Sequence, residues 1–256
     1  MKIAISRAYP VMITLFLALN LAGCATTTTN LPPEEPAMHS VKEFTEDENI
    51  IGNDPMEGYN RSMYKFNYNF DKYIFLPVVN TYEFILPSGA QTGVSNFFNN
   101  INEGRTLYNS VLQAKGGKAL TTLGRFVTNT TLGIGGLLDP ATGIGMKRQN
   151  EDFGQTLGVW GVPAGPYFVM PVLGPGTVRS ASGFLVDTAV HAAFVNTLDI
   201  PKNVDHGQAI LNVLAGLKAI DNRHQQPFRY HEHGYPFEYE LVQFLFIQSR
   251  EMQTMK

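Results

Sequence analysis

A run of 26 residues from Phe153 to Val178 places the strongest constraint on the fold of this chain. It reads FGQTLGVWGVPAGPYFVMPVLGPGTV, and it contains four prolines and six glycines but no Asp, Glu, Lys or Arg. Its length and lack of charge are those of a membrane-spanning segment, yet each interior proline removes a backbone donor and breaks a regular helix. The run therefore predicts an apolar, irregular segment. Lipid tolerates such backbone only where protein or a water-filled cavity covers it.

The N-terminus indicates an exported protein. Two basic residues, Lys2 and Arg7, precede an apolar run from Val11 to Gly23. This run is too short to cross a bilayer, and it is typical of a secretory signal. We therefore predict a signal peptide over residues 1–23.

Cys24 is the predicted lipid-attachment site. The sequence Leu21-Ala22-Gly23-Cys24 matches the bacterial lipobox, in which the cysteine is acylated and becomes the first residue of the mature protein. Cys24 is also the only cysteine of the chain. The alternative is a buried cysteine that follows a signal by chance. Ala25 stands where an aspartate resembles a signal for retention in the inner membrane, so we expect sorting to the outer membrane.

The composition changes twice after the signal. Residues 24–53 are rich in Thr, Pro and acidic residues, and they predict a disordered acidic tether. Residues 54–256 are nearly neutral and long enough for a single domain with a substantial core. Their charge gives no indication of a nucleic-acid partner.

Apolar residues at steps of three and four predict a mostly α-helical domain over residues 54–256. The first helix is expected to begin after Asp54 as cap. Its apolar face would contain Met56, Tyr59, Met63, Phe66 and Phe70, and its opposite face is rich in asparagine.

Further helices are predicted along the rest of the chain. One begins at Pro77 and ends before Pro87, and two more are capped by Ser88 and Asn102. After Gly116-Gly117, a helix carries a stripe that we expect to be buried, consisting of Ala119, Leu120, Leu123, Phe126 and Val127. The last three predicted helices are Ser180–Leu198, Gly207–Asn222 and Pro236–Met252. The segment with the most strand-like pattern is Tyr167–Val172.

The segment Thr131–Met146 contains five glycines and one charged residue, Asp139. One interpretation is a buried loop between helices, although buried backbone must find partners. The other is a glycine-rich hairpin that dips toward lipid, with a polar turn at Asp139-Pro140. Both interpretations stay open.

Motifs of common enzymes do not occur in the sequence. There is no G-x-S-x-G, no H-E-x-x-H and no second cysteine. We therefore predict that the protein is not an enzyme and requires no metal or other cofactor. The alternatives are a carboxylate pair drawn from Glu151, Asp152 and Asp187, and metal ligands among His224, His231, Glu232 and His233.

Three segments together resemble the MlaA (VacJ) family of outer-membrane lipoproteins. They are DPMEGYNRSMYKFNYNFDKYIFLPV, GRFVTNTTLGIGGLLDPA and EDFGQTLGVWGVPAGPYFVMPVLGPGTVR, and they cover roughly Asp54 to Gly183. The part from Val186 to Lys256 matches less specifically, and it lacks the long acidic tail of some members.

The resemblance implies a ring of amphipathic helices with Gly- and Pro-rich apolar connections, embedded in one membrane leaflet. Such proteins sit, lipid-anchored and facing the periplasm, in the inner leaflet of the outer membrane and associate with trimeric porins. They remove phospholipids from the outer leaflet through an amphipathic channel and pass them to a soluble, MlaC-like periplasmic carrier. This transport breaks no bond and requires no cofactor. The alternative function is a structural lipoprotein that scaffolds porins or tethers the envelope.

Two sets of residues are candidates for this transport. Asparagine and tyrosine can hydrogen-bond a lipid headgroup without holding it tightly, so the predicted lipid-path residues are Asn60, Tyr64, Asn67, Asn69, Trp160 and Tyr167. The alternative for the asparagines is a solvent-facing helix surface. Glycine permits the backbone change of a hinge, so the predicted gate is the hairpin Leu132–Met146, with Gly133, Gly135, Gly136, Asp139 and Gly143.

Overall fold

The computed structural model describes residues 38–43, 54–197 and 206–255. The predicted signal peptide, Cys24 and most of the predicted tether lie outside the described residues, as does Leu198. The described part is mostly helical, as predicted. Its elements in chain order are η1 (Val41–Glu43), α2 (Glu57–Phe70), η2 (Asp71–Phe75), α3 (Leu76–Ile85), α4 (Ser88–Leu112), α5 (Gly116–Thr131), α6 (Pro140–Gly143), α7 (Phe153–Val159), β1 (Tyr167–Met170), β2 (Gly174–Thr177), α8 (Val178–Thr197), α10 (Gly207–His224) and α11 (Glu238–Met255).

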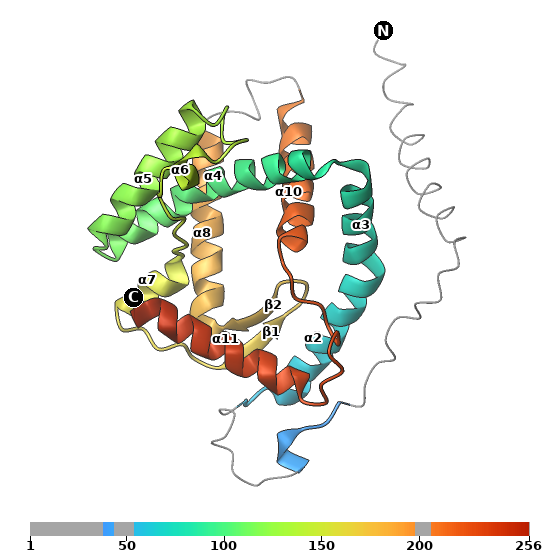
Figure 1. Cartoon of the computed structure of the whole chain (residues 1–256). Helices are drawn as coiled ribbons and strands as arrows, with labels where there is room; N and C mark the ends of the chain where they lie inside the picture. The colour runs from blue at the N-terminus through green and yellow to red at the C-terminus, as the bar shows by residue number, and fades with distance from the viewer. Residues whose placement is uncertain (1–37, 44–53, 198–205, 256) are drawn as a thin grey trace.

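The helices form a ring-like frame (Figure 1). Helix α4 crosses the top of the view, α2 and α3 follow the right side, and α8 descends on the left. Helix α11 and the β-hairpin close the frame at the bottom, while α10 descends from the top between α8 and α3. Within the described residues, none of the helices has both the length and the apolar character needed to cross a bilayer.

Most predicted helix positions are confirmed, but the three predicted caps are wrong. The N-cap of α2 is Met56 rather than Asp54, and the N-cap of α4 is Pro87 rather than Ser88. Asn102 does not cap a new helix, because α4 continues through it without interruption from Ser88 to Leu112. Its side chain instead accepts a hydrogen bond from Lys218 Nζ on α10, at 3.2 Å. A contact between distant elements thus uses the polar group that sequence reasoning assigned to a cap.

Helices α2 and α3 are joined by a π-helical turn, η2, rather than by a loop. The backbone N–H of Leu76 bonds to the carbonyl of Asp71, five residues earlier. The turn lies directly before Pro77, which has no N–H and whose ring clashes with the carbonyl of a regular preceding turn. A π-turn relieves this conflict and bends the chain without ending the helix.

Helix α2 buries the opposite face from the one that periodicity predicted. Met56, Tyr59 and Phe66 of the predicted apolar face are 43–44% exposed, whereas Asn60 and Asn67 are 0% and 4% exposed. The solvent-facing alternative for these two asparagines is therefore also wrong. These apolar side chains point outward because the asparagine contacts, together with Tyr64 and Tyr68, occupy the inner face.

Helix α5 shows the same inversion. The predicted buried stripe is exposed, with Leu120 at 73%, while Thr122, Arg125 and Asn129 are buried. Periodicity gave the two faces of this helix correctly but assigned the wrong one to the interior. A protein that buries polar stripes and exposes apolar ones has the pattern expected for contact with lipid.

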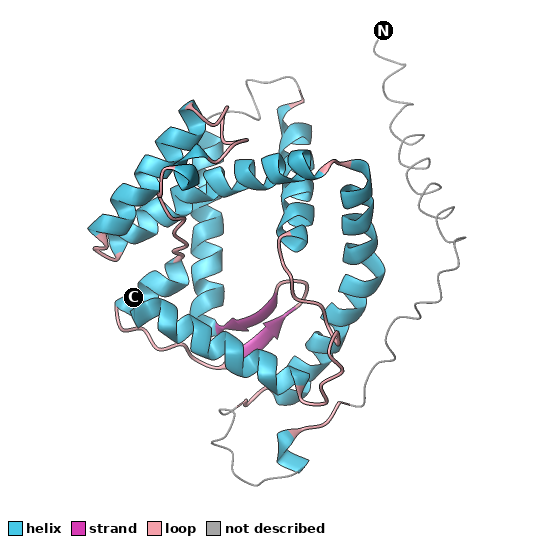
Figure 2. Ribbon diagram, viewed as in Figure 1, coloured by secondary structure: helices cyan, strands magenta, loops and turns pink. Residues whose placement is uncertain are grey.

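Helix α2, strand β1 and helix α11 meet at the bottom of the view (Figure 2), and a small aromatic core lies at this junction. Tyr64, Tyr167, Val169 and Tyr239 form it, and the ring of Tyr64 packs edge-on against that of Tyr239 at 5.7 Å. Strands β1 and β2 pair antiparallel with Tyr167 opposite Thr177. The strand expected near Tyr167–Val172 and the irregular character of the surrounding apolar run are thus confirmed.

Two asparagines of α2 form hydrogen bonds with the backbone of the β1–β2 hairpin. Asn60 Oδ1 accepts from the N–H of Val169 at 2.8 Å, and Asn67 Oδ1 accepts from the N–H of Val172 at 2.7 Å. Their amide groups donate to the carbonyls of Tyr167 and Met170 at 3.3 and 2.9 Å. The two asparagines lie two helical turns apart, so one face of α2 satisfies a row of buried backbone groups.

Residues 38–43 lie within the predicted tether but pack against the body. His39 N–H donates to the carbonyl of Pro236 at 3.0 Å, and Val41 N–H donates to Glu240 at 3.3 Å. Lys42 Nζ lies 2.8 Å from Glu57 on α2. This short segment is therefore held at the start of α2 and of α11, a contact that its composition did not indicate.

The buried asparagine contacts predict a large difference between two neighbouring substitutions. Asn60→Leu should lower the free energy of unfolding by about 2–4 kcal/mol, because it leaves buried backbone groups without partners. Asn69→Ala is the matched control and should change it by less than about 0.5 kcal/mol, since Asn69 bonds only within its own helix. Denaturant unfolding in detergent micelles measures both, and equal stabilities would contradict the assigned role of Asn60.

Candidate functional site

The structure separates the six predicted lipid-path residues. Asn60, Tyr64, Asn67 and Tyr167 are buried together where α2 meets β1 and α11. Tyr64 Oη donates to Glu238 Oε1 at 2.5 Å, and burial raises the pKa of Tyr64. The polar groups of Asn60, Asn67 and Tyr64 are thus bonded to protein, which gives them a structural task.

The other two predicted residues lie elsewhere. Asn69 is half-buried on α2 and donates to the carbonyl of Lys65 at 3.0 Å. Trp160 is exposed at the end of α7, packs edge-on against Phe153, and donates its indole N–H to the carbonyl of Leu112 at 3.1 Å. An exposed indole anchored by one hydrogen bond suits the polar boundary of a membrane.

The glycine-rich hairpin is tightly packed at its base. Gly133 is buried, and a Cβ there would lie 2.4 Å from the carbonyl oxygen of Asn129. Gly136 has φ +95°, and a Cβ there would lie 2.7 Å from Asn100. By contrast, Gly135 (φ +68°) and Gly143 have open space around them. Glycine is required at the base by close approach and at Gly135 by backbone conformation.

Arg125 of α5 forms hydrogen bonds with the base of the glycine-rich hairpin Leu132–Met146. Its guanidinium donates to Glu103 of α4 at 2.7 Å, to Asp139 at 3.0 Å, and to the carbonyl of Met146 at 2.6 Å. Both Arg125 and Glu103 are 2% exposed, so the pair is fully desolvated. Such a pair is costly to break, because removing one partner leaves a buried charge.

Asp139 is part of this network and does not form an exposed polar turn. It caps the short helix α6 by accepting from the N–H of Thr142 at 3.1 Å, and it also accepts from Asn129 at 2.9 Å. Burial favours its neutral form, but hydrogen bonds from Thr142, Arg125 and Asn129 outweigh burial and lower the pKa of Asp139 to about 2. Asp139 is therefore a carboxylate throughout the physiological range.

The outer surface of the hairpin is apolar. Leu132, Ile134 and Ile144 are all exposed, while the polar groups point toward α5. Ile134 also adopts a left-handed backbone conformation with φ +54°, which is strained for a β-branched residue. The hairpin thus has a polar anchor on the inside and apolar side chains on the outside.

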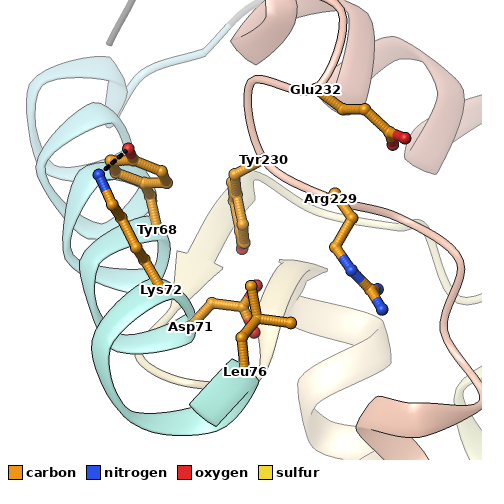
Figure 3. A pocket seen from close by; sticks show the side chains of 7 residues that line it. All are labelled: Tyr68, Asp71, Lys72, Leu76, Arg229, Tyr230 and Glu232. Atoms are coloured by element: carbon orange, nitrogen blue, oxygen red, sulfur yellow. Dashed lines mark hydrogen bonds between the residues drawn. The ribbon is translucent and has the colours of Figure 1, made fainter. Parts of the chain in front are cut away.

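A pocket of about 250 Å³ lies at the π-turn (Figure 3), lined by Tyr68, Asp71, Lys72, Leu76, Arg229, Tyr230 and Glu232. Asp71 forms a two-pronged ion pair with Arg223 of α10, at 2.6 and 2.7 Å. Lys72 Nζ donates to Tyr68 Oη at 3.0 Å, and burial raises the pKa of Tyr230 to about 12. Sequence reasoning missed this pocket, because it joins η2 to a segment more than 150 residues away in sequence.

The residues of the metal alternative are not brought together. His224 Nδ1 lies 2.6 Å from Glu83 Oε1, while the buried ring of His231 packs edge-on against Tyr68 at 4.7 Å. Among the described residues, no group of three or more His, Cys, Asp or Glu side chains is arranged to hold a metal ion.

The carboxylates of the enzyme alternative have structural partners. Glu151 pairs with Lys118, and Asp152 forms a two-pronged ion pair with Arg250 of α11 at 2.6 and 2.8 Å. Burial opposes ionisation of Asp152, but Arg250 and Gln155 lower its pKa to about 2. Asp187 accepts from Tyr108, Asn109 and the N–H of Phe153.

Polar contacts hold α4 across α8 and α10. On one side, Asn109 donates to Asp187 of α8 at 3.1 Å. On the other, Ser95 donates to Asp221 of α10 at 2.6 Å, and Asn99 donates to Gln225 at 3.3 Å. The section of α4 between these contacts crosses the top of the frame (Figure 1).

Comparison with known proteins gives consistent similarities. A sequence model of the MlaA lipoprotein family matches residues 52–253. The "Intermembrane phospholipid transport system lipoprotein MlaA" of Escherichia coli (strain K12) is 40% identical over 138 residues, which cover 52% of this chain and 55% of that protein. The protein of the same name from Haemophilus influenzae is 32% identical, over 70% of this chain and 66% of its own length. The chain thus spans about half to two-thirds of the curated relatives it matches.

A solved structure is similar as well. It comes from a study of the structural basis for maintenance of bacterial outer membrane lipid asymmetry, and it matches with a TM-score of 0.62 at 30% sequence identity. The match covers 79% of this chain and 99% of that chain.

The buried ion pair of Glu103 and Arg125 predicts a large loss of stability that a second substitution partly restores. Arg125→Met should lower the free energy of unfolding by about 3–5 kcal/mol, because Glu103 stays buried without its partner. The double variant Glu103→Gln/Arg125→Met should recover at least half of this loss, since no unpaired buried carboxylate remains. The exposed Lys147→Met is the control and should change stability by less than about 0.5 kcal/mol. Thermal and denaturant unfolding test the set, and a double variant no more stable than Arg125→Met would contradict the assignment.

Proposed function

The chain belongs to the MlaA lipoprotein family, and we propose that it removes misplaced phospholipids from the outer leaflet of the outer membrane and passes them to a soluble periplasmic carrier. The names of its relatives refer to intermembrane phospholipid transport, and the similar solved structure concerns outer-membrane lipid asymmetry. Transport of this kind breaks no covalent bond, so the protein would act as a conduit without a catalytic centre or cofactor. It would thereby maintain lipid asymmetry.

The observation that carries this proposal is the inverted burial of α2 and α5. Their apolar side chains face outward, and their polar side chains hold the ring together. In water each exposed CH₂ group costs about 0.8 kcal/mol, whereas lipid tails remove that cost. A ring that exposes this much apolar surface fits a position within one leaflet. We assign it to the inner, periplasm-facing leaflet.

The N-terminal segment supports the same placement. We propose that residues 1–23 are removed, that Cys24 is acylated, and that residues 24–53 tether the body to this anchor. Residues 38–43 dock onto the starts of α2 and α11, so the anchored chain would meet the ring at a fixed place. One acyl chain holds a protein only marginally, and the apolar perimeter of the body would supply the remaining membrane affinity.

A phospholipid needs a path that is apolar for its tails and polar for its headgroup throughout. We propose that the frame formed by α4, α8 and α10 provides the polar side, with the exposed Trp160 marking the headgroup level. Asn60, Tyr64, Asn67 and Tyr167 would then hold the wall together rather than touch lipid. Asn69, which is half-buried on α2, is the proposed rim contact. The direction of transport would come from removal of lipid by the downstream carrier.

The hairpin Leu132–Met146 is the proposed gate. Its base at Gly133, Gly136 and Asp139 is fixed to α5, whereas Gly135 and Gly143 have room to change conformation. Its exposed apolar side chains favour the lipid-facing interpretation. A trimeric porin is a further proposed partner, because a ring in the inner leaflet needs a protein that reaches the outer one.

A structural lipoprotein that scaffolds porins or tethers the envelope is the second candidate. The anchor and tether would serve it equally well. A scaffold has no need for a strained glycine hairpin with an apolar outer surface, so this feature favours transport.

Deletion of the gene and complementation test the proposed function. Without the protein, phospholipid exposed on the cell surface should rise several-fold, as measured with a surface-acting phospholipase as reporter, and complementation should restore the wild-type level. Porin abundance is measured in the same cells. No rise in surface phospholipid, together with reduced porin, would overturn transport in favour of the scaffold.

The gate generates its own prediction. Gly135→Val should raise surface-exposed phospholipid at least twofold over wild type, because a β-branched residue strongly disfavours φ +68° and restricts the hairpin. Gly117→Ala is the control outside the hairpin and should behave as wild type, since Gly117 lies in the first turn of α5 and has open space around it. A folded, membrane-localised Gly135→Val protein with wild-type phospholipid levels would exclude this hairpin as the gate.

A further inference from the structure

Three cationic side chains gather where α4 passes between α8 and α10. They are Arg105 on α4, Lys218 on α10 and Arg148 in the segment after α6. Among the described residues, none of the three has a carboxylate within ion-pair distance, and we call them the cationic cluster. Elsewhere Arg125, Arg223 and Arg250 are each paired with a carboxylate.

Hydrogen bonds of Lys218 and Arg105 place the cationic cluster along α4. Lys218 Nζ donates to Asn102 Oδ1 at 3.2 Å, and Asn102 lies three positions before Arg105 on the same face of α4. Arg105 Nη2 donates to Asn150 Oδ1 at 2.9 Å, and Asn150 lies two residues after Arg148. The three cations therefore lie near one short section of α4, between its contacts with α10 and with α8.

The cationic cluster holds donors that the protein does not use. The Nε of Arg105 is buried and has no hydrogen-bond partner. Arg148 forms no hydrogen bond with the described residues. Its side chain is exposed to solvent, but it lies close enough to other protein atoms for burial to lower its pKa. A buried unpaired donor costs free energy, so a ligand that accepts from these groups would stabilise the site.

The cations also repel one another across the frame. Burial, and then the charge of Arg105, lower the pKa of Lys218, and burial followed by the charge of Lys218 lowers the pKa of His191 on α8. Glu103 and Asp139 attract Arg148 at longer range, but both are bonded to Arg125. Asp187 is likewise occupied by Tyr108, Asn109 and Phe153.

We propose that the cationic cluster binds the phosphodiester of an anionic phospholipid and gives the ring a preference for anionic over zwitterionic headgroups. Phosphate oxygens accept charge-assisted hydrogen bonds from guanidinium and ammonium groups. An anionic headgroup compensates the excess charge, whereas a zwitterionic headgroup brings an ammonium group that the cluster repels. This inference rests on the proposed passage of lipid through the frame, and it assigns the headgroup class that passes most readily.

Binding to the purified protein tests the proposal independently of transport. The full-length mature lipoprotein in neutral detergent is titrated with short-chain phosphatidylglycerol, short-chain phosphatidylethanolamine and inorganic phosphate, with calorimetry as the readout. We expect the wild type to bind phosphatidylglycerol at least tenfold more tightly than the other two ligands. Arg105→Gln and Lys218→Gln should each weaken binding of phosphatidylglycerol about tenfold and leave phosphatidylethanolamine within about twofold.

Two matched variants separate charge in the cationic cluster from charge in general. Lys118→Gln removes a cation of α5 that already pairs with Glu151, and it should bind phosphatidylglycerol like the wild type. Arg105→Lys keeps the charge and should retain most of the affinity. Helical content measured by circular dichroism confirms that each variant is folded.

Three results would overturn the proposal. They are equal affinity of the wild type for the two lipids, an equal loss in Lys118→Gln, or inorganic phosphate binding as tightly as phosphatidylglycerol, which would assign the site to free phosphate. A wild-type preference for phosphatidylglycerol that the cluster variants abolish, combined with no change in surface phospholipid on gene deletion, would support the site and reject the proposed transport.

Discussion

Polar contacts between elements hold this protein together, because its apolar side chains lie on the outside. The buried pair of Glu103 and Arg125 joins α4, α5 and the glycine hairpin, and Asp152 with Arg250 joins α7 to α11. In a water-soluble protein these tasks fall to a hydrophobic core, but the aromatic core here is small. Hydrogen bonds with directional geometry therefore define how the helices cross, and the apolar perimeter is left available for lipid.

The sequence predicted the helices better than it predicted their orientation. Periodicity located α2, α3, α5, α8, α10 and α11, and the proline-rich run correctly indicated irregular structure around β1. It placed the apolar stripe of α5 inside, because periodicity distinguishes two faces of a helix without stating which solvent each one meets. Asn102 was misread for a related reason, since an asparagine side chain bonds equally well to its own backbone or to a distant lysine.

The candidate site was only partly predictable. The importance of the glycine hairpin follows from its composition, and the structure supplies the reason for individual glycines, such as the close approach at Gly133 and Gly136. The cationic cluster could not be predicted, because Arg105 and Lys218 are more than a hundred residues apart and each is ordinary on its own helix. Only the crossing of α4 with α10 makes them neighbours.

The junction of α2 with α11 has a consequence for how the protein is made. Asp54 and Arg61 bond to Tyr239 and Glu240 near the other end of the chain, so the ring closes through contacts between its first and last helices. Contacts this distant in sequence form late, since the intervening chain must be ordered first. Until α11 packs against α2, the chain is an open arc, and only the docking of this last helix closes the ring.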